Sequence, residues 1–129
     1  MITALVLMCA ATACAAGERQ NVLFIIVDDL RPELPVYGQD HIQAPHISSL
    51  AEESVVFANA YSNVPVCGAS RASFMSGVRP TRTRFVDFDA RLDEDAPDAV
   101  PLHSFLVANG YHAESIGKVM HAYRDSIDG

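Results

Sequence analysis

The sequence predicts an α/β fold, built on part of a mostly parallel sheet that helices flank. The first observation is the run 22–27, which is apolar at every position, as in strands that helices cover on both faces. The second is the order of segments, in which strand character alternates with helical periodicity. No repeat or linker divides residues 21–129, and 50% of the 129 residues are hydrophobic, so the chain has material for one modest domain.

Residues 1–16 form a separate segment, which we interpret as a secretory signal peptide. The segment carries no charged side chain and is an apolar run too short to span a membrane. Ala13-Cys14-Ala15 fits a cleavage site, whereas 11–14 is alternatively a lipoprotein box in which Cys14 is acylated. We therefore expect an exported protein, periplasmic, secreted or lysosomal, that contacts a membrane only if Cys14 is lipidated.

Strand and helix segments follow one another after the leader. Residues 31–45 are rich in proline and glycine and predict a loop. Helical periodicity begins at Pro45, with apolar side chains at positions 47, 50 and 51. Residues 55–61 predict a second, short strand, and a loop then runs to Val66.

The second half of the chain continues the alternation. Three elements are predicted there: helices over 69–75 and 102–109, and a strand over 111–116. Gly77 and Gly110 stand where the two helices should end. Residues 79–97 show no periodic pattern, and we expect their acidic patch to face solvent.

The charge balance limits the partners of the chain. Its formal net charge is −7 and its pI is near 5.0, so no basic face is available to compete for the phosphates of nucleic acid. Cys9 and Cys14 lie in the leader, which leaves Cys67 unpaired in the mature chain and excludes an internal disulfide. Cys67 is then either a reactive group or a structural thiol.

Cys67 is followed four residues later by Arg71, a spacing that places both side chains on one face of a helix starting at Cys67. The N-terminus of a helix is electropositive and attracts anions. A cysteine at that end, beside a fixed cation, is a candidate nucleophile or a modified catalytic residue in a site for an anionic group. The alternative is a small buried cysteine with Arg71 as a surface charge.

Two further sites are predicted where strands end. Asp28 and Asp29 follow the strand 22–27, where open α/β sheets bind ligands, and carboxylate oxygens favour Ca²⁺ or Mg²⁺ over zinc. The alternative for this pair is a capped turn with a solvated neighbour. Lys118 and His121 either face one anion together or are surface residues. The other histidines show no partner pattern and are treated as structural or exposed: His41, His46, His103 and His112.

These three strand-end sites together resemble the N-terminal part of the sulfatase family. The matching stretches are 21–29, 57–62, the Cys67-Gly68-Ala69-Ser70-Arg71 signature followed by Met75-Ser76-Gly77, and Gly110-Tyr111 with Gly117-Lys118. Within the family the chain is most similar to the iduronate-2-sulfatase type, on residues 28–32, 79–80, 83–88 and 117–121.

The resemblance implies a fold and a mechanism. The fold is the alkaline-phosphatase-like sulfatase N-terminal domain, incomplete in this chain. A formylglycine-generating maturation enzyme would oxidise Cys67 to formylglycine, and the hydrated aldehyde would attack the sulfur of a sulfated sugar. The family also implies a divalent cation, Ca²⁺ with Mg²⁺ as the alternative, held by Asp28, Asp29 and the modified residue 67.

The resemblance also assigns the charged side chains around Cys67. Arg71 would orient the hydrated aldehyde, Lys118 would bind the sulfate, and His121 would assist proton transfer. Sulfatases of this kind are considerably longer, with further site residues beyond Gly129. We therefore expect the isolated 129 residues to be an inactive N-terminal fragment.

The leading hypothesis is thus a sulfuric ester hydrolase that acts on a sulfated carbohydrate, such as a glycosaminoglycan. Two other functions stay open at this point. A phosphodiesterase or phosphonate-ester hydrolase of the same superfamily can share the modified cysteine and a similar metal site. The non-enzymatic alternative is an exported binding domain in which Cys67 is inert.

Overall fold

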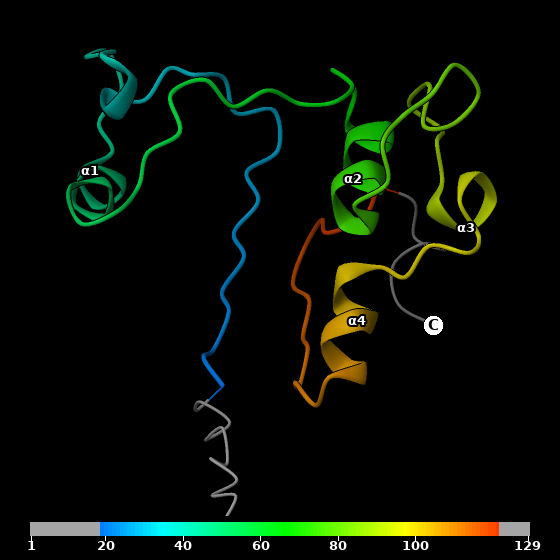
Figure 1. The fold of residues 1–129 in the computed structure, drawn as a ribbon. Coiled ribbons are helices and arrows are strands. Elements are labelled where there is room, and N and C mark those ends of the chain that lie inside the picture. The colour runs from blue at the N-terminus through cyan, green and yellow to red at the C-terminus, as the bar shows by residue number, and fades with distance from the viewer. Residues whose placement is uncertain (1–18, 122–129) are drawn as a thin grey trace, which may run out of the picture.

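The computed structural model describes residues 19–121, so the predicted leader lies outside the described residues. In this range the elements are a 3-10 helix, η1 (Pro35–Tyr37), and four α-helices: α1 (Pro45–Glu52), α2 (Cys67–Ser76), α3 (Leu92–Asp95) and α4 (Leu102–Ala108). Helix α1 contacts η1, whereas α2 contacts both α3 and α4. Figure 1 shows these two groups apart, joined by extended segments. No helix in the described range is long and apolar enough to cross a membrane.

Three of the helices are those that the sequence predicts. Helix α2 ends where Gly77 takes a φ of 68°, a left-handed conformation that glycine adopts without steric cost. Helix α1 begins on Pro45 and α4 directly follows Pro101, and the fixed φ of proline suits the start of a helix. Helix α3 lies in the stretch 79–97 that was expected to be irregular. It is too short for a periodic pattern, and acidic residues in its first turn favour it.

The buried core surrounds α2. Its members are small or apolar side chains: Ala69, Ala72, Met75, Phe85, Ala90, Leu92 and Met120. Phe85 is completely buried and has a φ of 54°, a conformation that bulky residues rarely adopt. Its backbone N–H donates to Asp95 Oδ2 at 3.4 Å, which ties the loop to α3. The core thus packs the chain before α3, and the segment around Met120, against the helix that begins at Cys67.

The three predicted strands, 22–27, 55–61 and 111–116, are not strands in the structure, because no residue between 19 and 121 is assigned to one. A strand requires a hydrogen-bonded neighbour, and among the described residues no backbone hydrogen bond joins these segments. Their apolar side chains stay exposed accordingly, Leu23 at 85% and Ile116 at 92%. The described part of the chain therefore does not form the predicted parallel sheet.

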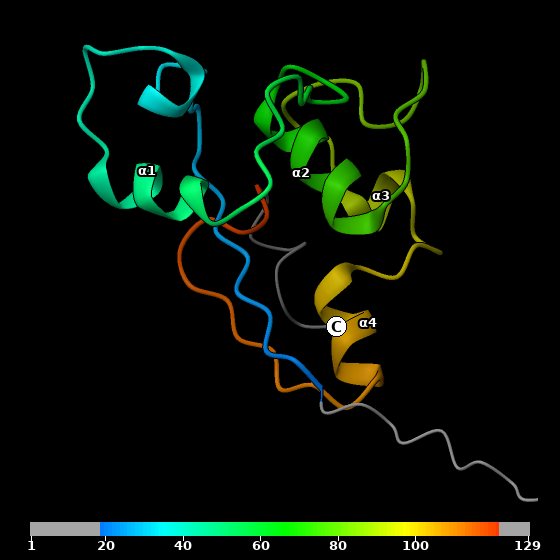
Figure 2. The ribbon, with the colours of Figure 1, turned by 60° about the vertical axis from the view of Figure 1, so that its left-hand side comes forward.

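The segments 22–27 (blue) and 111–116 (orange) nevertheless run side by side in the same direction, as Figures 1 and 2 both show. At one end Arg19 Nη1 donates to the Gly110 carbonyl at 3.0 Å, and at the other Lys118 Nζ lies 2.7 Å from Asp28 Oδ2. A cavity of about 670 Å³ is lined by both segments together with α4. The side chains of Arg19 and Lys118 thus bridge the two extended segments near their ends, where no backbone-to-backbone hydrogen bond joins them among the described residues.

Candidate active site

Helix α2 has Cys67 as its first residue and so begins before the helix predicted over 69–75, at the position that the spacing of Cys67 and Arg71 requires. Val66 precedes it in an extended conformation, and no side chain caps the N–H groups of the first turn. The Cys67 thiol is partly buried and forms no disulfide within the described range. It lines a cavity of about 350 Å³ together with Asp28, Asp29 and Arg71. The aspartate pair and the cysteine, distant in sequence, thus share one concave site.

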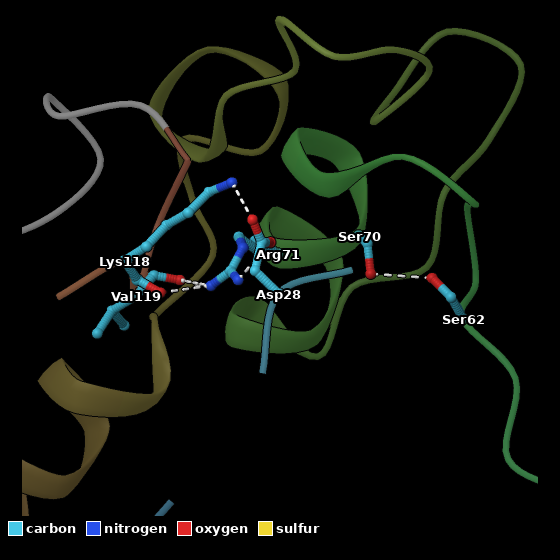
Figure 3. A network of polar contacts seen from close by, with 6 residues as sticks. All are labelled: Asp28, Ser62, Ser70, Arg71, Lys118 and Val119. Atoms are coloured by element: carbon cyan, nitrogen blue, oxygen red, sulfur yellow. Dashed lines mark hydrogen bonds and ion pairs between the residues drawn. The ribbon is translucent and has the colours of Figure 1, made fainter. Parts of the chain in front are cut away.

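Arg71 joins three separate segments of the chain (Figure 3). Its side chain is only 4% exposed, and Nη2 donates to Asp28 Oδ1 at 2.8 Å. Nη1 donates to the main-chain carbonyls of Lys118 and Val119 at 2.6 and 2.9 Å. A planar guanidinium can serve several fixed acceptors at once, so it holds two chain segments against α2. The alternative of a surface charge is therefore wrong for Arg71.

Asp28 also forms an ion pair with a second basic side chain, that of Lys118. Lys118 Nζ donates to Oδ2 at 2.7 Å while Arg71 donates to Oδ1, so each carboxylate oxygen has its own donor. The hydrogen bond from Lys118, followed by that from Arg71, lowers the pKa of Asp28 below its ordinary value of 3.8. Asp28 is consequently anionic at neutral pH. Its side chain is 43% exposed, so solvent screens both ion pairs.

The ion pairs of Asp28 predict an acid-dependent loss of stability in the metal-free protein. A carboxylate with a lowered folded pKa stabilises the fold above the unfolded value of 3.8, and this contribution is lost as the pH falls through the folded pKa. This is measured by urea titrations of the wild type and of Asp28→Asn from about pH 2.5 to 6, with a chelator present. The wild type should have the larger free energy of unfolding, and its difference from Asp28→Asn should shrink below pH 3.8. The exposed Asp98→Asn is the matched control. An Asp28→Asn difference that is constant with pH would contradict this prediction.

Asp29 lines the same cavity in a different backbone conformation. Its φ of 53° is left-handed, which aspartate tolerates in turns. The oxygens of Asp28 and Asp29 are the donor type that Ca²⁺ and Mg²⁺ prefer. Residues 19–121, however, contain no group of three or more His, Cys, Asp or Glu side chains placed to hold a metal ion. Both oxygens of Asp28 also accept hydrogen bonds, from Arg71 and from Lys118. The donor chemistry fits the predicted cation, whereas the described ligand set is incomplete.

His121 contacts Phe88 and is not among the residues that line the cavity of Cys67. The two ring centroids are 4.1 Å apart and the ring planes meet at 73°. The Nδ1 atom of His121 is buried and makes no hydrogen bond within the described part of the chain. Sequence reasoning missed this contact because Phe88 lies in a stretch without periodicity, where nothing connects it to a later histidine.

Other contacts of the site were also missed. The carbonyls of Lys118 and Val119, which accept from Arg71, leave no signature in a sequence. Beside α2, the hydroxyl oxygens of Ser62 and Ser70 lie 2.9 Å apart, which links the preceding loop to the helix (Figure 3). The sequence therefore identified the charged side chains but not the groups that fix them. The catalytic and metal-binding roles that the resemblance assigns stay predictions.

Arg71 connects Asp28 and the segment of Lys118 to the helix that begins at Cys67. Comparisons with known proteins identify the family in which this site occurs. A family model described as Sulfatase matches residues 20–126, so the chain belongs to the sulfatase family. Among curated proteins, the chain is 41% identical over 112 residues to iduronate 2-sulfatase of Mus musculus and 44% identical over 109 residues to that of Homo sapiens. It is 35% identical over 112 residues to choline-sulfatase of Rhizobium meliloti.

These alignments cover most of this chain but a small part of each relative. They include 87%, 84% and 86% of this chain, and 20%, 20% and 21% of the mouse, human and bacterial proteins. The chain therefore spans about a fifth of the length of these relatives. No solved structure matches the chain significantly. The predicted membership of the sulfatase family, and the likeness to the iduronate-2-sulfatase type, are confirmed.

Proposed function

We propose that the full-length protein is a sulfuric ester hydrolase that removes sulfate from a sulfated carbohydrate. The observation that carries this proposal is the meeting of Asp28, Arg71 and Lys118 beside the helix that begins with Cys67. In a member of the sulfatase family, these charges can bind an anionic ester next to a nucleophile. The higher identity to iduronate 2-sulfatases than to choline-sulfatase favours a sugar sulfate over choline sulfate.

Cys67 is the precursor of the nucleophile in this proposal. Its side chain shares one cavity with Asp28 and Asp29, the two carboxylates that the family resemblance assigns to the cation. A formylglycine-generating enzyme would use molecular oxygen to oxidise the Cβ of residue 67 to an aldehyde, with the sulfur leaving at the sulfide level. The hydrate of this aldehyde carries two hydroxyl groups. One hydroxyl attacks the sulfur and expels the sugar alcohol. The other then loses its proton, and elimination of sulfate restores the aldehyde.

The charged residues have complementary roles in this reaction. A divalent cation, Ca²⁺ or Mg²⁺, would be held by Asp28, Asp29 and residue 67, with further ligands from outside the described residues, and would neutralise sulfate charge. Arg71, fixed by main-chain carbonyls, would orient the hydrated aldehyde of residue 67. Lys118, whose side chain is 40% exposed and whose Nζ pairs with Asp28, would bind the sulfate.

The surroundings of the site complete the proposal. His121 assists proton transfer to the departing alcohol. The segments 22–27 and 111–116, which already run parallel, become strands of a mostly parallel sheet in the complete alkaline-phosphatase-like domain. The apolar residues 1–16 direct export, with membrane attachment only through Cys14.

Turnover by the full-length gene product tests this function. The protein is coexpressed with a formylglycine-generating enzyme, supplied with Ca²⁺, and offered a sulfated disaccharide, an aryl sulfate and an aryl phosphate diester. We expect faster cleavage of the sulfate esters than of the phosphate diester. Preferential cleavage of the diester would favour a phosphodiesterase of the same superfamily, and the absence of any turnover would favour an inert binding domain.

A further inference from the structure

The imidazole of His121 is placed by packing rather than by a hydrogen bond in the described part of the chain. Catalytic and metal-binding histidines are usually oriented by a hydrogen bond at the ring nitrogen that does not react. Here Nδ1 is buried and has no such partner among residues 19–121, while the Phe88 ring lies 4.1 Å from the imidazole in an edge-to-face arrangement. The contact with Phe88 is thus an interaction in the described range that restrains this ring.

Phe88 is in turn positioned by the start of α2. Gly68 is buried, and a Cβ added there would overlap the Phe88 carbonyl oxygen and lie 2.9 Å from its carbonyl carbon. The backbone of residue 88 can therefore approach the helix directly beside Cys67, because residue 68 has no side chain. The Phe88 side chain gains little from burial, since the residue is 52% exposed. A half-exposed aromatic ring with a fixed backbone suits a positioning role better than a core role.

We propose that Phe88 is a positioning residue that sets the orientation of His121 relative to residue 67. Its backbone rests on Gly68, next to residue 67, and its ring packs against the imidazole. The chain of contacts from Gly68 through Phe88 to His121 therefore links the nucleophile's helix to the proposed proton donor. The catalytic consequence rests on the proposed function, whereas the orientation of the imidazole does not.

A double-mutant cycle in the matured full-length gene product tests the catalytic part. Phe88→Leu should lower kcat for a small sulfate ester about tenfold with little change in KM. The expected loss is smaller than the whole rate contribution of general acid catalysis, because the histidine itself is still present. Phe88→Tyr, which retains the ring, should restore the wild-type rate. In a His121→Ala background, Phe88→Leu should cause no further loss, because its effect acts through the histidine. Independent, multiplying losses from the two substitutions would overturn the proposal.

Acylation of histidine by diethyl pyrocarbonate tests the orientation without reference to activity. Peptide mass spectrometry follows the modification rates of His121 and of His112, whose side chain is 85% exposed and serves as the internal control. Phe88→Leu should accelerate modification of His121 several-fold and leave His112 unchanged, whereas an unchanged His121 rate would overturn the proposal. If the wild-type protein cleaves no sulfate ester, the proposed function fails, and the acylation rates alone decide the positioning role.

Discussion

Replacing Arg71 by methionine is expected to destabilise the fold by about 3 kcal/mol. Methionine retains an apolar stem but leaves the part-buried carbonyls of Lys118 and Val119 without their donor. An acceptor left unsatisfied by burial costs roughly 1–3 kcal/mol. Loss of the pair with Asp28 adds less, because that carboxylate is 43% exposed and keeps its bond to Lys118. The main-chain carbonyls therefore dominate the expected loss.

Urea denaturation of the full-length gene product, with divalent cations chelated, measures this effect. The exposed Arg82→Met is the matched control and should change the unfolding free energy by less than about 0.5 kcal/mol. Arg71→Lys should recover only part of the loss, because an ammonium group cannot reproduce the planar fork of a guanidinium. An Arg71→Met variant as stable as the wild type would show that other contacts hold the three segments together.

Replacing Cys67 by alanine is expected to lower kcat for sulfate esters on the order of 10⁶-fold, the scale seen when a covalent nucleophile is removed. The thiol is only partly buried, so the fold itself should lose little stability. Initial rates on an aryl sulfate measure the loss, and thermal unfolding of the same sample verifies the fold. Wild-type turnover by Cys67→Ala would mean that another group attacks the ester.

The helices could be predicted because their signals are local. Helix α2 ends at Gly77, as was predicted from this glycine. Helix α1 begins at Pro45, as was predicted from this proline and the helical spacing of the apolar residues after it. The strands depend on partners. The run 22–27 is apolar on both faces, a pattern that describes burial between neighbours, and the described residues supply no hydrogen-bonded neighbour. Strand propensity therefore predicted segments that are extended in the structure, whereas the parallel sheet predicted from them is not formed by the described residues.

The site could be predicted as far as its charged side chains. Asp28, Arg71 and Lys118 were assigned to one active site by the resemblance to sulfatases, and in the structure they lie in direct contact. Their pairing with each other could not be predicted, because opposite charges pair according to distances that a sequence does not contain. The contact between Phe88 and His121 was equally invisible, since it depends on how the loop after α2 folds back.

Mass spectrometry of the peptide that contains residue 67 tests the proposed chemistry most directly. The full-length gene product is expressed with and without a formylglycine-generating enzyme, and its thiols are alkylated before digestion. With the maturation enzyme, we expect a peptide of lower mass that takes up no alkylating reagent and reacts with a hydrazide. An intact, alkylated Cys67 in a host that converts a control sulfatase would contradict the proposal.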